Sequence, residues 1–338
     1  MTPQLSAGLA SLLASVAVAP GGTTATVADR TVRARTPAGL ERELGTALYE
    51  TFHTGHPWTA GARPPLALQD TALVAALSNE IPHLRVERTV PLAQQASGSP
   101  RARPVPPAAL RPGVASHDLV VSLDGVRVRC PGRRVTPDWG VGTARVELTP
   151  ERASLSPGFF SVLGTCEPTP GKPLLRVYVH PADSRAAVPL WGRVLRRLED
   201  SQAAYQAKVL SLPSAHPRRD GLVVYLGHGS WHHCHDVAEA LQNQSDTAAG
   251  TSVFARRLAP GVAIAWEPDD ARPQMRGLSF GQHRAAVLAR ALVRAGQRHL
   301  SPARAAEALR EARIDPLAPY RNTGSPREDT TNVSGGGS

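Results

Sequence analysis

Apolar residues along the chain recur either every three to four positions or every second position, and these two spacings predict different elements. The longer spacing predicts helices over residues 7–16, 38–52, 187–202, 237–242, 281–298 and 302–313. Alternation predicts strands over residues 23–34, 118–122, 126–130, 144–148, 174–180, 205–210 and 221–226. This order of elements predicts an α+β fold, with mixed or antiparallel sheets flanked by helices.

Composition divides the chain into four segments. Residues 1–93 form a mainly helical N-terminal part, and residues 114–325 form an α+β core. Residues 94–113 are rich in Pro, Ala, Arg and Ser, so we expect a flexible surface loop there. Residues 326–338 predict a disordered tail. With 41% hydrophobic residues among 338, the chain can bury one large core or two closely packed ones.

The apolar and cysteine content favours a soluble, cytoplasmic protein without a metal site. No apolar stretch approaches the length of a membrane span, so we expect no membrane association. Cys130, Cys166 and Cys234 are too few and too scattered for a disulfide framework or a thiolate cage. Residues 227–236 gather His and Cys, and zinc is one interpretation. Because neighbours in sequence cannot all converge on one ion, we favour a polar loop.

The net charge of +10 favours an anionic partner. Nucleic acid is the general expectation for a basic protein. However, the arginines are spread along the chain, only 4% of the residues are aromatic, and no nucleic-acid-binding motif is present. A phosphorylated or acidic peptide fits the charge equally well.

Lysine is rare in this chain, because Lys and Arg together number 38 and only Lys172 and Lys208 are lysines. Lys208 lies in an expected strand, and Lys172 lies in a turn-like Pro-Gly-Lys-Pro segment. A desolvated lysine amine can lose its proton and act as a base, whereas a guanidinium stays charged. Lys208 is therefore a candidate base, and a solvated strand residue is the alternative.

The expected strand at residues 174–180 carries several reactive side chains on one face. Alternation places Arg176, Tyr178 and His180 together, opposite an apolar face. Arginine can bind a phosphate or carboxylate through two hydrogen bonds, and Tyr and His can transfer protons. If this strand lies beside the strand that contains Lys208, the lysine reaches the same face. A half-exposed edge strand is the alternative.

Two further arginines are candidate anion ligands. Arg256 follows Phe254, and Arg284 follows His283 close to an expected helix start at Gly281. Free backbone N–H groups and the helix dipole favour an anion at such a start, so Gly281 and Arg284 are a candidate phosphate seat. A solvated first helical turn is the alternative.

Taken together, these segments resemble the HopA effector family. The segments that carry the resemblance are residues 48–49, 52–55, 155–160, 176–178, 208–210, 224–226, 254–256, 265–268, 279–284 and 319–322, which occur in the family's order. The resemblance covers about residues 40–325 and implies a HopA effector-like fold. Ala255, Phe160 and Arg321 depart from residues that are frequent in the family, and Phe160 removes one possible proton donor.

The stand-alone bacterial members of this family resemble lyases of class V lanthipeptide and thioamitide biosynthesis. The resemblance implies elimination of phosphate from phosphoserine or phosphothreonine in a precursor peptide, after a kinase-like partner has phosphorylated it. Residues 114–325 would then be a lyase-like core that requires no metal or organic cofactor.

The residues suit this reaction, which needs a base, cations and a proton donor. We assign Lys208 as the base. The phosphate ligands would be Arg176, Arg256 and Arg284, and the candidate proton donors are His53, Tyr178, His180 and His283. The alternatives are a non-catalytic, effector-like module that binds proteins or phosphopeptides, and an arginine-rich nucleic-acid binder.

Overall fold

The computed structural model describes residues 4–56, 69–93, 118–123, 126–152, 156–167, 173–296 and 299–326. The loop expected over residues 94–113 lies outside the described residues, as do residues 327–338 of the expected tail. Among the described helices, none is long and apolar enough to cross a bilayer.

A six-stranded sheet forms the centre of the molecule. Its strands, in spatial order, are β13 (Arg256–Ala259), β14 (Val262–Trp266), β10 (Leu175–Val179), β12 (Leu222–Leu226), β11 (Tyr205–Leu210) and β9 (Phe159–Leu163). Each neighbouring pair in it is antiparallel. β10 and β11 are therefore not neighbours, because β12 lies between them.

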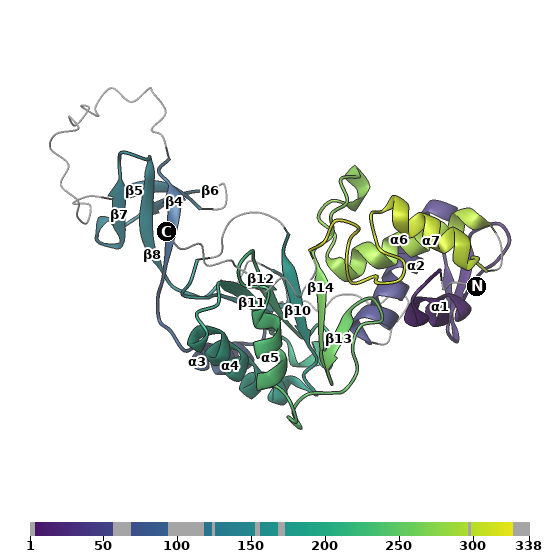
Figure 1. The fold of residues 1–338 in the computed structure, drawn as a ribbon, viewed down its shortest axis with the longest axis horizontal. Coiled ribbons are helices and arrows are strands. Elements are labelled where there is room, and N and C mark those ends of the chain that lie inside the picture. The colour runs from purple at the N-terminus through teal and green to yellow at the C-terminus, as the bar shows by residue number, and fades with distance from the viewer. Residues whose placement is uncertain are drawn as a thin grey trace, which may run out of the picture.

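Helices cover both faces of this sheet (Figure 1). Leu175, Val177 and Val179 belong to a core shared with α3 (Thr71–Asn79), α4 (Ser184–Asp200) and α5 (His233–Ala240). Tyr178 and Val223 belong to a second core, shared with α1 (Ala7–Ala14), α2 (Pro37–Leu48), α6 (Phe280–Ala295) and α7 (Pro302–Glu311). The alternation predicted for residues 174–180 is confirmed, although both faces of β10 are buried and Tyr178 itself belongs to a core.

The N-terminal region contains more strand than its apolar pattern indicated. The single strand expected over residues 23–34 is wrong, because β2 (Thr24–Val27) and β3 (Arg30–Arg33) form a hairpin that β1 (Val16–Val18) extends. The chain reverses at Ala28, whose φ of 53° lies in the left-handed region. Thr and Val continue to alternate through the hairpin, so the sequence pattern does not mark the turn.

A small β unit lies apart from the helices in Figure 1. It contains a sheet of β4 (Val86–Pro91), β8 (Thr143–Leu148) and β7 (Val135–Asp138), and a hairpin of β5 (Leu119–Leu123) and β6 (Val126–Cys130). Val90, Val121, Val135 and Val146 fill its core. This core is separate from the two beside the central sheet.

Candidate functional site

The face of the central sheet that packs against α2 and α6 carries most of the candidate chemistry. Strand register places Lys208 of β11 and Tyr178 of β10 in one row, each opposite Val223 of the intervening strand. The next row contains Tyr225 of β12 and Arg176 of β10. The alternation predicted from the sequence thus brings Lys208 to the face that carries Arg176, two strands away.

A cavity of about 480 Å³ opens on this face, and we call it the central cavity. Among the described residues, its cationic lining consists of Lys208, Arg176 and Arg276, and its acidic lining consists of Glu267 and Asp270. The cavity therefore gathers three positive charges from three separate parts of the chain, which suits it to an anionic group.

Lys208 is the only lysine of the described residues, and its amine points over aromatic rings. Nζ lies 4.2 Å from the ring centroid of Phe159 and 5.8 Å from that of Tyr225. No carboxylate of the described residues forms an ion pair with it. The rings contact the Lys208 amine through cation–π or van der Waals interactions. The amine lines the cavity.

Arg176 is held on two sides at the wall of the cavity. Its Nε donates to Oε2 of Glu267, and its guanidinium lies 5.1 Å from the ring centroid of Tyr225. Burial opposes the charge on Arg176, but the acidic groups of Tyr178 and Glu267 outweigh burial and raise its pKa. Arg176 therefore stays positively charged at the wall of the cavity.

The first turn of α6 also lines the central cavity, through Ser279 and Gln282. These two residues form a reciprocal capping box, in which Ser279 N–H donates to the Gln282 side chain. The positive end of the helix dipole therefore lies beside the three cations. This is the helix start that the sequence marked as a phosphate seat, although Arg284 does not reach the cavity from it.

Several cavity residues were not candidates from the sequence, among them Arg276 and Tyr49. Arg276 is exposed and stands directly before Gly277, whose φ is 77°. Tyr49 begins a π-helix (Tyr49–Thr54) that continues α2, and its hydroxyl accepts a hydrogen bond from Arg218 at 2.9 Å. Arg276 gives no periodic signal in an arginine-rich chain. A π-helix at the end of α2 leaves no sequence pattern either.

His53 lies beneath the cavity and does not line it. Its Nδ1 is 2.8 Å from the Ser252 hydroxyl, and its ring stacks on Tyr49 and contacts the edge of Tyr178. Burial lowers the pKa of His53 to about 4, although Asp220 opposes that shift. His53 is therefore separated from the cavity, and its assignment as a proton donor stays a prediction.

His283 and Arg284 belong to a buried hydrogen-bonded chain. Arg284 donates to His283 Nδ1, to Pro319 O and to Asn322 Oδ1, each at 2.9 Å. Because a guanidinium can only donate, His283 carries its proton on Nε2 and donates to Asp270 at 2.9 Å. Burial and Arg284 lower the pKa of His283 to about 4. These residues join α6 to the C-terminal segment.

The remaining candidate residues lie elsewhere. Tyr178 is buried under α6, where burial raises the pKa of its hydroxyl. His180 donates Nδ1–H to Gly250 O at 2.9 Å, beyond the end of β10. Arg256 pairs with Ile264, which belongs to the core on the opposite face of the sheet. The structure therefore brings Lys208 and Arg176 together and leaves these three outside the central cavity.

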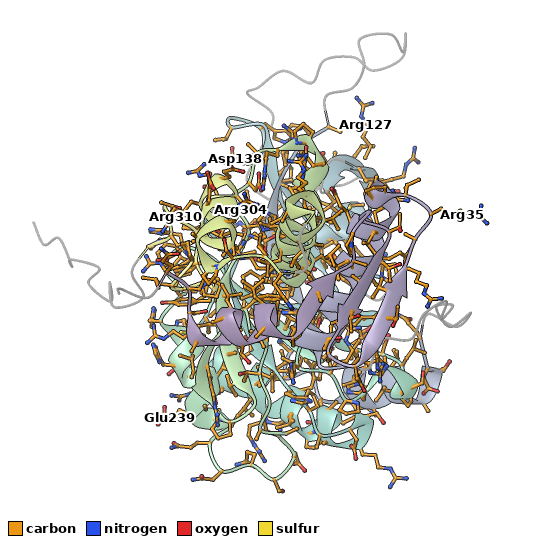
Figure 2. The ribbon with its side chains drawn as sticks, turned by 90° about the vertical axis from the view of Figure 1, so that its right-hand side faces the viewer. Arg35, Arg127, Asp138, Glu239, Arg304 and Arg310 are labelled. Atoms are coloured by element: carbon orange, nitrogen blue, oxygen red, sulfur yellow. The ribbon has the colours of Figure 1, made fainter. Side chains whose placement is uncertain are left out.

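Much of the other positive charge lies on separate parts of the surface. Arg35, Arg127, Arg304 and Arg310 are exposed, and in Figure 2 Arg35 and Arg127 lie away from Arg304 and Arg310, which are neighbours on α7. The central cavity differs from this dispersed charge because its three cations line one cavity.

The model of the HopA1 effector protein family matches residues 150–321, about half of the chain. The matched stretch contains the whole central sheet, α4 to α7, and the cavity residues Lys208, Arg176 and Arg276. Tyr49 and His53 lie before it. No curated protein matches the chain.

Two solved structures match part of this chain. They are the effector proteins from Pseudomonas syringae pv. tomato strain DC3000, at 20% identity and a TM-score of 0.39, and from Pseudomonas syringae pv. syringae strain 61, at 16% and 0.38. Each match covers 48% of this chain and 62% of the other, so this chain spans less than two thirds of either effector.

Proposed function

The chain belongs to the HopA1 effector protein family, and from that premise we propose that it is a phosphoserine or phosphothreonine lyase. Its substrate would be a precursor peptide that a kinase-like partner has phosphorylated, as in lanthipeptide or thioamitide biosynthesis. Its product would contain dehydroalanine or dehydrobutyrine. The observation that carries the proposal is the central cavity, where one lysine amine and two guanidinium groups meet.

The reaction is a β-elimination at the phosphorylated residue. The Lys208 amine takes the Cα proton, the electron pair of that C–H bond forms the Cα=Cβ double bond, and the Cβ–O bond breaks. Phosphate leaves with the electron pair of the broken bond. Atoms and charge balance without an oxidant, a reductant, a metal or an organic cofactor.

The cations of the cavity match the negative charge in this reaction. Arg176 and Arg276 would bind the phosphate oxygens, and the N-terminus of α6 would add its dipole on the same side. Fixed positive charges in a partly enclosed site stabilise charge that develops in the transition state. Because phosphate leaves as a stable anion held by arginine, the mechanism requires no histidine in the cavity.

Lys208 has the side chain that suits the base. It is placed by β11, a central strand that is paired on both sides, so its backbone is rigid. Phe159 and Tyr225 then fix the direction of the amine. Arginine at this position would keep the positive charge but would not accept a proton.

Mass spectrometry tests the proposal on a phosphoserine peptide incubated without metal or nucleotide. We expect wild type to release phosphate and give a product that adds a thiol. Lys208→Arg should bind the peptide but lose elimination by about 100-fold or more, as expected for removal of a general base. Arg304→Lys, an exposed variant on α7, should retain full turnover.

The outcomes separate the functions. Retained turnover in Lys208→Arg would remove the lysine from the base role. A wild-type protein that binds the phosphopeptide but leaves it intact, even with the kinase and leader present, would replace the lyase with the non-catalytic binding module.

A further inference from the structure

A second cavity, of about 720 Å³, lies between facing sides of α2 and α6, and we call it the α2–α6 cavity. α2 contributes positions 38, 41, 42, 45 and 46, and α6 contributes positions 282, 286 and 290, a spacing of four. Such spacings place each set on one side of its helix. Gln274, Met275 and Leu278 close the cavity from the loop before α6.

The α2–α6 cavity adjoins the central cavity, because Tyr49, Met275, Leu278 and Gln282 line both. On the other side of the central cavity lies a third cavity of about 280 Å³. Arg176, Tyr225 and Glu267 line both the central and the third cavity. The three cavities are therefore consecutive, and the proposed phosphate site is the middle one.

The α2–α6 cavity differs from its neighbour in chemistry. Ala38, Gly45, Met275, Leu278 and Ala286 supply small or apolar walls. Its charged residues are two acids, Glu41 and Glu50, and two bases, Arg42 and Arg290. Because these charges cancel, the cavity has no net attraction for a second phosphate, and its walls favour an apolar side chain.

One buried donor in the α2–α6 cavity also lacks an acceptor. Arg290 Nε is buried and has no hydrogen-bond partner among the described residues. Buried N–H groups are almost always paired, so such a group marks a place where an acceptor belongs. Because this atom is enclosed, the Arg290 side chain would shift to donate to the carbonyl of an extended peptide beside the apolar wall.

We propose that the precursor peptide lies extended across the three cavities, with an apolar side chain near the phosphorylated residue in the α2–α6 cavity. Arg290 donates to a backbone carbonyl of the same segment. This inference rests on the proposed function for the identity of the middle residue. It adds that sequence preference arises at α2 and α6, away from the reacting atoms.

The test uses a phosphoserine peptide set in which leucine or aspartate is placed at each of the three positions before and after the phosphoserine. Binding is measured by fluorescence anisotropy on matching peptides with a phosphonate, in which CH₂ replaces the bridging oxygen and elimination is impossible. Elimination of the phosphoserine peptides is followed separately by mass spectrometry. Binding and turnover are thereby read independently.

Two variants fill the α2–α6 cavity from opposite walls, Ala286→Trp from α6 and Thr46→Trp from α2. Ala303→Trp, an exposed change on α7, is the matched control, and thermal unfolding checks that all three variants fold. We expect wild type and the control to prefer leucine by about 10- to 100-fold at one or two adjacent positions. Both cavity variants should lose that preference, raising KM for the leucine peptide with little change in kcat.

Equal binding of the leucine and aspartate peptides by wild type would overturn the inference, as would an unchanged preference in both folded cavity variants. A leucine preference that the cavity variants abolish, without elimination by wild type, would support the inference and refute the lyase. Elimination at the same rate from the leucine and aspartate peptides would support the lyase and refute the inference. Absence of both binding and elimination would refute both proposals.

Discussion

Replacement of Gly281 by alanine is expected to destabilise the protein, although alanine favours helix. Gly281 lies in the first turn of α6, against the His53 ring. A Cβ atom built there would lie 2.7 Å from His53 Nε2 and closer still to Cγ and Cδ2. The ring cannot easily move, since His53 is 2% exposed, is hydrogen-bonded to Ser252 and stacks on Tyr49.

The magnitude follows from two opposing effects. Overpacking a rigid core costs up to about 3 kcal/mol, and three ring atoms in contact place this site at the upper end of that range. The higher helix propensity of alanine offsets at most about 1 kcal/mol of this cost. Gly281→Ala should therefore lower the free energy of unfolding by about 2 kcal/mol.

Gly45→Ala is the matched control. Gly45 lies inside α2, where a Cβ atom would meet Ala286 Cα and Ala289 Cβ at an ordinary 3.8 Å. With no clash, the same substitution should stabilise the protein by about 1 kcal/mol. Urea denaturation followed by the fluorescence of the buried Trp191 and Trp266 measures both variants. If the two variants have the same free energy of unfolding, the His53 ring moves without cost, and the reasoning is refuted.

Two further predictions concern the buried polar groups. The free energy of unfolding should fall as the pH drops from 6.5 to about 4, because unfolded His53 and His283 bind protons near pH 6.5 whereas burial holds the pKa of each folded ring at about 4. Unfolding midpoints measured across this window should fall less steeply for His53→Gln. Arg284→Lys should cost about 3 kcal/mol, since a lysine cannot donate to His283, Pro319 and Asn322 together in this buried geometry. Urea denaturation measures it, and a loss below 1 kcal/mol would contradict the assigned role of this network.

Local patterns predicted the elements whose side chains repeat regularly. The two faces of β10 followed from alternation, which is a property of extended backbone. The start of α7 followed from Ser301, whose side chain accepts from Arg304 N–H, and from proline at the next position. Short segments such as β13 and β14 were missed, because β13 has only four residues and Val262–Trp266 is apolar and buried throughout, without alternation.

The identity of the cavity residues was only partly predictable. Lys208 and Arg176 were named from residue type and alternation. His53 and His283 were named from residue type but lie in buried networks, because a sequence does not show which polar side chains are enclosed. Arg276 was missed, since nothing local distinguishes it from the other arginines.

The sequence by itself determined the α+β composition, the division of β10 into an apolar and a reactive face, and the rarity of lysine. Tertiary structure alone decided which groups share the central cavity. β12 separates Lys208 from Arg176, and the loop before α6 brings Arg276 and Asp270 to the same space. The physical reason is that alternation and capping act over a few residues, whereas the cavity depends on strand pairing and helix packing between segments far apart in the chain.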